Sequence, residues 1–329
     1  MENVERQEQV KRLQARAKAA VVRPEARSLL QDAVRQFFKN RLAIIGLGII
    51  TLFIFAAVLG PIIAPYDFFD QDLTNTLQRP SAAHPLGTDQ FGRDILSRLL
   101  YGARTAAIVA FSSTIISLLL GLAVGTIAGF SGGRVDQFLM WLSDLVQSIP
   151  GLLLAMLVNT ALKRPVANWF EVRYLQTGDP FYQNTLWLDF VLVFGSLALI
   201  GWPGFARLVR SQVLSIAETD YVLAARAVGV KKQRIMLRHI IPNALGPVVV
   251  AVSQGMGGAI VAESGLSFLG VGVQPPNASW GTMLNKSLPL WQIAPHLLIA
   301  PAATIGLIQV AFIFFGDGLN DALNPRYRK

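Results

Sequence analysis

Six stretches of this sequence are apolar over roughly the 20 residues that an α-helix needs to cross a hydrocarbon core of about 30 Å. They are residues 42–64, 105–130, 137–162, 186–206, 244–262 and 295–315. The third contains Asp144 and Pro150, and the fourth contains Asp189. Because only helices and closed barrels satisfy their backbone hydrogen bonds in lipid, the pattern predicts an all-α, polytopic membrane protein with six transmembrane helices.

The composition excludes the main alternatives to a membrane protein. Hydrophobic residues make up 53% of the 329 residues and charged residues only 15%, whereas a soluble domain usually has about a quarter of its residues charged. The absence of cysteine excludes a disulfide-stapled scaffold. The net charge of +9 does not indicate nucleic-acid binding, because the basic residues fall between the apolar stretches. The first stretch is too long for the core of a signal peptide, so we expect it to remain in the mature protein.

The positions of Lys and Arg predict the orientation, because loops rich in these residues stay in the cytoplasm. Of the 29 Lys and Arg residues, 21 fall in the N-terminal segment, the loop around Arg134, the 207–242 loop and the C-terminal segment. The other eight fall in the intervening loops. We therefore expect both termini and the 207–242 loop to be cytoplasmic.

The pattern divides the chain into four segments. We expect a cytoplasmic tail at 1–41, a first transmembrane helix and external loop at 42–104, a core membrane domain at 105–320 and a cytoplasmic tail at 321–329. Residues 28–39 carry an apolar stripe that predicts an amphipathic helix. Such a helix lies either on the membrane surface or against the protein's own core, and the sequence leaves both open.

The 207–242 loop carries the most informative local pattern. Asp220 is a good N-cap, residues 221–228 fit two turns of helix, and Gly229 favours the left-handed conformation that ends a helix. A second short helix is expected to end at Pro242, where the fifth span begins. One face of the first helix comprises Tyr221, Ala224, Ala225 and Val228. This face fits a groove on another protein, and packing against the chain's own membrane domain is the alternative.

This loop resembles the EAA loop of binding-protein-dependent ABC transporter permeases. The similarity rests on Ala224-Ala225, on Gly229 and on the closing run RHIIPN at 238–243. Leu223 stands where the glutamate of the EAA motif is found. Any contact that this glutamate makes in relatives is therefore not carried over.

Three other blocks support the same resemblance. They are HPLGTDQFGRD at 84–94, LSFLG to SWG within 266–281, and GDGL to NPR within 316–326. Together with the loop, they are similar to the dipeptide/oligopeptide/nickel branch of the family and to its C-type subunit. The resemblance extends from about residue 28 to the end of the chain.

The resemblance implies the type I permease fold of ABC importers and a set of partners. The chain would form half of a translocation pathway beside a homologous B-type permease, with two ATP-binding subunits and an extracytoplasmic substrate-binding protein. The loop helix would be the coupling helix, seated in a cleft of one ATPase. The residues assigned to this coupling are Tyr221, Ala224, Ala225, Gly229, Arg238, His239 and Pro242.

The chain has no phosphate-binding loop of the form G-x-x-x-x-G-K-[ST]. We therefore expect partner subunits to bind and hydrolyse ATP, with no cofactor, catalytic residue or enzymatic activity on this chain. The resemblance further implies the cytoplasmic (inner) membrane of a bacterium or archaeon. It favours a peptide as cargo and leaves nickel chelates and some sugars open.

Polar and aromatic residues within the spans are candidates for the translocation path, because ionisable groups are costly in lipid. The candidates are Asp144, Gln147, Trp202, Gln254 and Glu263. Asp144 is expected to bond another helix or to lie near the cytoplasmic gate. Glu263 lies near the outer end of the fifth span, where contact with a cationic group of a peptide or a metal ion is the alternative to a structural role. Trp202-Pro203-Gly204 predicts a kink, and the glycines that follow Gln254 favour close helix packing.

Two external segments were weighed for other roles. The 84–94 block contains His84, Asp89 and Asp94, but a helix cap at Thr88 or Asp89 and turns at its glycines explain it better than a metal site. No metal is therefore expected. The segment 163–186 is rich in aromatic residues, which we expect at the membrane interface or against the binding protein.

Two other classes of membrane protein are compatible with six spans. A secondary transporter or channel that works without an ATPase is favoured by inverted repeats and charged residues at the middle of the spans, and neither is evident. A membrane-embedded enzyme requires a cluster of catalytic polar groups, which the spans lack.

Overall fold

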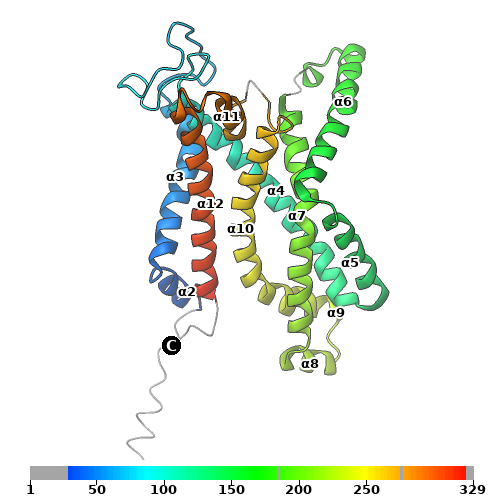
Figure 1. Ribbon diagram of the computed structural model, residues 1–329. Coiled ribbons are helices and arrows are strands. Elements are labelled where there is room, and N and C mark those ends of the chain that lie inside the picture. Colours follow the sequence, from blue (N-terminus) through cyan, green and yellow to red (C-terminus); the bar gives the residue numbers. More distant parts are fainter. Residues whose placement is uncertain (1–28, 184–185, 275–276, 324–329) are drawn as a thin grey trace, which may run out of the picture.

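The computed structural model describes residues 29–183, 186–274 and 277–323, which form helices joined by loops (Figure 1). Within these ranges there is no β-strand, only an isolated antiparallel bridge. The all-α prediction is confirmed for this part of the chain. Residues 1–28 and 324–329, which include most of the two predicted tails, lie outside the described residues.

Five helices are each long and apolar enough to cross a membrane. They are α3 (Arg41–Ile63), α4 (Ile95–Ser131), α7 (Leu186–Ala217), α10 (Ile241–Phe268) and α12 (Pro295–Leu323). The pair α5 (Gly133–Gln147) and α6 (Gly151–Thr177) passes the same test only together, with a bend of 84° at the break between them. With this pair counted as one broken span, the structure has the six spans that the sequence predicts.

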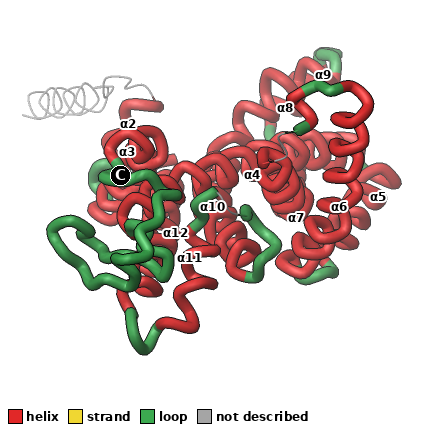
Figure 2. Tube along the Cα trace, turned by 90° about the horizontal axis from the view of Figure 1, so that it is seen from above, coloured by secondary structure: helices red, strands yellow, loops and turns green. Residues whose placement is uncertain are grey.

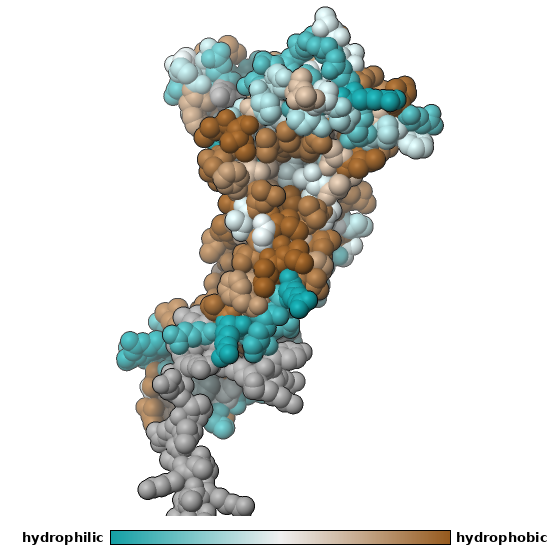
Figure 3. All heavy atoms as spheres, turned by 90° about the vertical axis from the view of Figure 1, so that its left-hand side faces the viewer, coloured by the Kyte–Doolittle hydropathy of each residue, from teal (hydrophilic) through white to brown (hydrophobic). Residues whose placement is uncertain are grey.

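The spans lie side by side, and α4 runs obliquely to the others and contacts several of them (Figure 1). Seen from above, α3 and α12 lie on one side, α10 and α4 in the middle, and α5, α6 and α7 on the other side (Figure 2). α4 packs against α3, α7 and α10 and so connects the two sides. The largest buried apolar cluster includes Phe53, Ile95, Trp280 and Phe312. On the α3 side of the molecule, apolar side chains form a belt between two polar ends (Figure 3).

Shorter elements lie at the two ends of the spans (Figure 1). The end that we name the α11 end has α11 (Trp280–Ser287), η3 (Leu288–Leu290), η1 (Pro180–Tyr182) and the loop 64–94. The end that we name the α8 end has α2 (Leu29–Phe37), α8 (Asp220–Ala227), α9 (Lys232–Ile235) and the π-helical turn η2 (Met236–Ile240).

The second and fourth spans are longer than predicted. α4 begins at Ile95 rather than at residue 105, and its 37 residues correspond to about 55 Å. The prediction stopped too early because Arg98 and Arg104 interrupt the apolar pattern, although Arg98 is buried against the 64–94 loop. α7 runs without a break through Trp202-Pro203-Gly204 to Ala217. A kink at that proline stays a prediction.

The third span, predicted at 137–162, is broken. Pro150 lies in the break and lacks a backbone N–H, so α5 ends before it and α6 begins after it. α6 then continues to Thr177, so most of the segment 163–186 is helix. Its aromatic rings pack on one another around Phe170.

The predicted amphipathic helix is α2, and it docks on the protein's own core. Ala33 and Phe37 are buried among side chains of α3 and α12, and the Phe37 ring contacts Phe315 edge-on at 5.5 Å between centroids. Of the two alternatives, packing against the protein's own core therefore describes this helix. Its other side, with Val34 and Phe38, is apolar and exposed.

Candidate functional site

The loop helix α8 follows α7 almost directly. α7 ends at Ala217 and α8 begins at Asp220, with Thr219 as its N-cap. The expected cap, Asp220, lies instead in the first turn, because Thr219 is the last residue with extended backbone. At the other end Gly229 has a φ of 77°, which confirms the predicted left-handed stop.

One side of α8 packs against the chain's own membrane domain. Val222 is fully buried and Ala225 is partly buried. The surrounding apolar cluster consists of Val209, Val213, Ile235, Ile240 and Val248. Since this cluster includes residues of α7, α9, η2 and α10, α8 is fixed to the elements on both sides of it. Ala225, predicted on the outward face, is thus only partly accessible, because it packs against this cluster.

The other side of α8 is apolar and exposed. Val228 is 80% exposed, and Tyr221, Leu223 and Ala224 are also exposed. Three of the four residues predicted to share one face thus remain accessible, and Leu223 adds a further apolar side chain. Exposed apolar surface beyond the ends of the spans is typical of a protein contact site. α8 therefore combines a docked side with a side that is free for a partner.

The connection from α8 to α10 differs from the prediction. Pro242 does not end a short helix; it lies in the first turn of α10, and helical structure continues through it from α9. The π-helical turn η2 precedes it, with the Ile241 N–H donating to the Met236 carbonyl. This wider turn accommodates the proline ring, which clashes with the preceding turn of an ordinary α-helix. Arg238 is exposed, and the His239 ring lies 6.3 Å from the Tyr221 ring.

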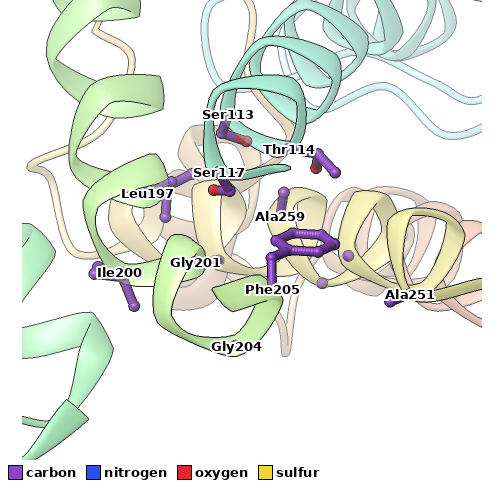
Figure 4. A pocket seen from close by; sticks show the side chains of 13 residues that line it. Ser113, Thr114, Ser117, Leu197, Ile200, Gly201, Gly204, Phe205, Ala251 and Ala259 are labelled. Atoms are coloured by element: carbon purple, nitrogen blue, oxygen red, sulfur yellow. The ribbon is translucent and has the colours of Figure 1, made fainter. Parts of the chain in front are cut away.

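A cavity of about 360 Å³ lies between α4, α7 and α10 (Figure 4). Its lining comprises Ser113, Thr114, Ser117, Leu197, Ile200, Gly201, Gly204, Phe205, Ala251, Gly255, Gly258, Ala259 and Ala262. None of these residues is charged. Small side chains and hydroxyl groups therefore form most of the wall, with the Phe205 ring across it.

Glycines create much of this space. A Cβ added at Gly204 or Gly258 would meet no atom within 4 Å. By contrast, a Cβ at Gly257 would lie 2.6 Å from the Gln309 side-chain oxygen. The close helix packing predicted for these glycines thus applies to Gly257. Gly255 and Gly258 instead line the cavity.

The five residues proposed for the translocation path do not line this cavity. Asp144 pairs with Arg207 of α7 at 3.2 Å, which agrees with an interhelical contact. Gln147 and Gln254 are exposed, and Trp202 is buried. The lining was missed because glycine, alanine and serine give no signal in a search for polar or ionisable groups within spans.

Glu263 is placed differently from the prediction. It is 1% exposed and accepts hydrogen bonds from the hydroxyls of Ser267 at 2.7 Å and Ser279 at 2.9 Å. Ser279 is also the N-cap of α11. Glu263 therefore does not face the outer mouth, because its carboxylate is occupied in joining α10 to α11.

The SWG run that includes Ser279 packs tightly. The Trp280 indole N–H donates to the Leu99 carbonyl at 3.0 Å, and its ring covers Gly102. A Cβ added at Gly281 would lie 2.1 Å from the Ser264 carbonyl oxygen. The run therefore joins α4, α10 and α11 at the α11 end.

The charged residues of the 84–94 block have partners within the chain. Asp94 is the N-cap of α4, where it accepts from the Ser97 N–H and lies 3.0 Å from the His84 Nδ1. The cap predicted at Thr88 or Asp89 is thus wrong, because Asp89 instead binds Arg93. The two glycines of the block have φ values of 82° and 71°, as expected for turns.

Lys286 of α11 lies beside this block. Burial lowers the pKa of the Lys286 ammonium, and the nearby cations Arg93 and Arg98 lower it further, while Asp89 opposes them. Its Nζ lies 5.6 Å from the centre of the Phe91 ring. The α11 end thus holds several cations close together.

Comparison with known proteins gives a consistent result. Residues 121–329 match the family model "Binding-protein-dependent transport system inner membrane component", and residues 28–80 match "N-terminal TM domain of oligopeptide transport permease C". The chain is 38% identical over 298 residues to the dipeptide transport system permease protein DppC of Alkalihalophilus pseudofirmus, covering 91% of this chain and 90% of the relative. It is 36% identical over 302 residues to the oligopeptide transport system permease protein OppC of Bacillus subtilis, with coverages of 92% and 91%. It is 34% identical over 297 residues to the glutathione transport system permease protein GsiD of Pectobacterium atrosepticum, with coverages of 89% and 90%.

Proposed function

Because this chain belongs to the family of binding-protein-dependent transport system inner membrane components, we propose that it is the C-type permease subunit of an ATP-driven importer of di- and oligopeptides. The observation that carries the proposal is the two-sided packing of α8, with Val222 buried and Val228 80% exposed. The names of relatives that transport dipeptides, oligopeptides and glutathione support a peptide cargo.

In this proposal α8 is the coupling helix, and its partner is one of two ATPase subunits. The contact is made by Tyr221, Leu223, Ala224 and Val228, which together offer an apolar surface. ATP is bound and hydrolysed by these partners and not by this chain. The α8 end then faces the cytoplasm, which the excess of Lys and Arg in the predicted inner segments supports.

The cavity is the contribution of this subunit to the pathway. Two of the three helices that line it, α7 and α10, are the same two that flank the α8 segment. A rigid-body displacement of α8 is therefore passed directly to the cavity wall. A homologous B-type permease completes the other half of the pathway, and a substrate-binding protein delivers the peptide from outside.

An uncharged wall suits a cargo of variable sequence. A charged group in the wall would attract some peptides and repel others, because Coulomb energies are large where water is excluded. Hydroxyl and glycine positions such as Ser113, Ser117 and Gly258 impose no such preference. Selection among peptides is then left to the binding protein.

The proposal is tested by cross-linking in a chain that has no native cysteine. In the assembled transporter, Val228→Cys is expected to cross-link to an ATPase subunit. Leu175→Cys, 76% exposed near the end of α6, is the matched control and should not. Cross-linking of Leu175→Cys alone, or peptide uptake without any ATPase, would contradict the proposal.

A substitution gives an independent readout. Val228→Asp introduces a charge on the exposed side and is expected to abolish co-purification of the ATPase while the permease remains folded. Ala225→Asp is less informative, because Ala225 packs on the buried cluster beneath α8 and the variant would also destabilise the fold.

A further inference from the structure

α5 is a helical segment between two backbone joints. It begins at Gly132-Gly133, whose φ values of 63° and 54° lie in the left-handed region. It ends at the break before Pro150, where the helix axis turns by 84° into α6. A Cβ added at either glycine would meet no atom within 4 Å. The glycines are therefore required for the backbone conformation and not for close packing.

Few apolar contacts hold α5 in place. Its main neighbours are α4, which precedes it, and α7. Ser143 is the one α5 residue that is buried in the described chain, whereas Phe138, Trp141 and Leu145 are exposed. The position of α5 thus depends on something other than a shared apolar core.

Two ion pairs join α5 to α7. Asp136 accepts from the Arg210 Nε at 2.5 Å and from its Nη2 at 2.6 Å, and both side chains are partly buried. Asp144 pairs with Arg207 at 3.2 Å, and these two side chains are largely exposed. Because a bidentate, partly buried pair is stronger than an exposed single contact, Asp136–Arg210 is the principal connection.

α7 links this connection to α8. Arg210 lies two turns before the end of α7 at Ala217, and α8 begins at Asp220. The preceding turns of α7 carry Gly204 and Phe205, which line the cavity. One continuous helix therefore carries the cavity wall, the ion pair to α5 and the attachment of α8.

We propose that Asp136 and Arg210 are positioning residues for transport: their pair makes α5 move as one body with α7 when α8 moves, and the joints at Gly132-Gly133 and Pro150 permit this motion. The inference rests on the proposed coupling of α8 to an ATPase. Without the pair, α7 moves while α5 stays behind. The α8 end of the pathway then opens incompletely, although the ATPase still turns over.

The test uses the complete transporter in proteoliposomes, with peptide uptake and ATP hydrolysis measured together. Breaking a charged, hydrogen-bonded pair is expected to lower uptake per ATP by about tenfold in Asp136→Asn. The charge exchange of Asp136→Arg with Arg210→Asp should restore most of it, which a general loss of folding would not allow. Normal uptake per ATP in both Asp136→Asn and Arg210→Ala would overturn the proposal.

Asp189→Asn is the matched control. It also removes an ion pair of α7, to Lys163 of α6 at 2.8 Å, but at the α11 end of the helix. The change in uptake per ATP should stay below about twofold, because this pair joins α7 to α6 far from α8 and leaves the connection between α5 and α7 intact. A tenfold effect in this control would show that any ion pair of α7 matters equally, and the special role of Asp136–Arg210 would be lost.

A covalent connection tests the motion directly. The native chain has no cysteine, so Asp136→Cys with Arg210→Cys can be joined by a bifunctional thiol reagent. Joining should restore the uptake lost in the unjoined double variant, because α5 and α7 stay together throughout the cycle. If joining instead blocks uptake, the helices separate and the proposal is wrong. Failure of the proposed function itself appears elsewhere, as absence of the cross-link from Val228→Cys to the ATPase.

Discussion

At the α11 end several charged side chains are buried and paired, whereas α5 and α8, towards the opposite end, each bury a single described residue, Ser143 and Val222. Asp94 and Glu263 each accept hydrogen bonds from neighbouring groups and are almost inaccessible to solvent. Trp141 of α5 is 58% exposed, and Val228, the C-cap residue of α8, is more exposed still. The first region therefore contains a buried polar network, and the second buries little surface of its own.

The two ends should therefore differ in rigidity. The hydrogen bonds of Glu263 to buried serine hydroxyls favour one arrangement, because any other leaves a buried group without a partner. Segments with few buried contacts open and shift at lower free energy. Substitutions of the same kind in both regions test this contrast.

The largest effect is expected from filling the cavity between the two ends. Gly258→Leu should leave the fold intact, because a Cβ there meets nothing, and should reduce peptide uptake to the level seen without ATP. Gly281→Ala at the α11 end should instead reduce the yield of folded protein, since its Cβ would strike the backbone of α10. Gly48→Leu, at an exposed glycine of α3 with open space around it, is the control and should transport normally.

Truncating one tryptophan at each end compares their packing directly. Trp280→Ala should lower the free energy of unfolding by about 3–5 kcal/mol, the range for a large buried aromatic residue. Trp141→Ala should change it by no more than about 0.5 kcal/mol, as for a surface residue. Denaturant unfolding of the purified complex measures both. Equal losses would show that the two ends are equally well packed.

Two carboxylates provide a smaller contrast. Glu263→Ala removes the acceptor of buried serine hydroxyls and should cost about 1–3 kcal/mol. Asp144→Ala removes an exposed ion pair and should cost less than about 1 kcal/mol. The same unfolding measurement applies. If Asp144→Ala loses more stability than Glu263→Ala, the exposed ion pair contributes more than the buried hydrogen bonds, and the contrast between the two regions is wrong.

The smallest effect concerns Lys286 and depends on pH. Because burial lowers its pKa from 10.5, the unfolded chain binds this proton more tightly than the folded chain. The free energy of unfolding should therefore rise as the pH rises from the lowered pKa towards 10.5. In this range the folded chain has already lost the proton, while the unfolded chain still binds it. Lys286→Met should be slightly more stable than the native chain at neutral pH, and this difference should shrink at alkaline pH. If the stability difference between Lys286→Met and the native chain instead grows with pH, the pKa of Lys286 is not lowered by folding.

The sequence predicted the spans better than their ends. Average hydropathy located all six, and the chemistry of Gly229 located the end of α8, because both depend on local properties. The start of α4 was missed because Arg98 reads as a polar boundary, while its burial depends on a loop folded over it. Likewise, the partial burial of the Ala225 side chain depends on contacts with residues distant in sequence, which periodicity does not reveal.

The candidate site was predictable only in part. The residues proposed for coupling lie within one short loop and could be named from the sequence, whereas the cavity is assembled from three helices and has no motif of its own. The ion pairs of α5 join residues 63 and 74 positions apart. No single-sequence pattern connects such positions, because each charge alone is compatible with a solvated surface.

The length of α4 has a mechanical consequence. Its first turn is secured among the buried charges around Asp94, and its last turn leads into the glycine joint of α5. α4 thus runs as one continuous helix from the α11 end to the joint that precedes α5. In the coupling mechanism proposed above, a small tilt of α4 at its α11 end produces a larger displacement at its other end, where α5 begins.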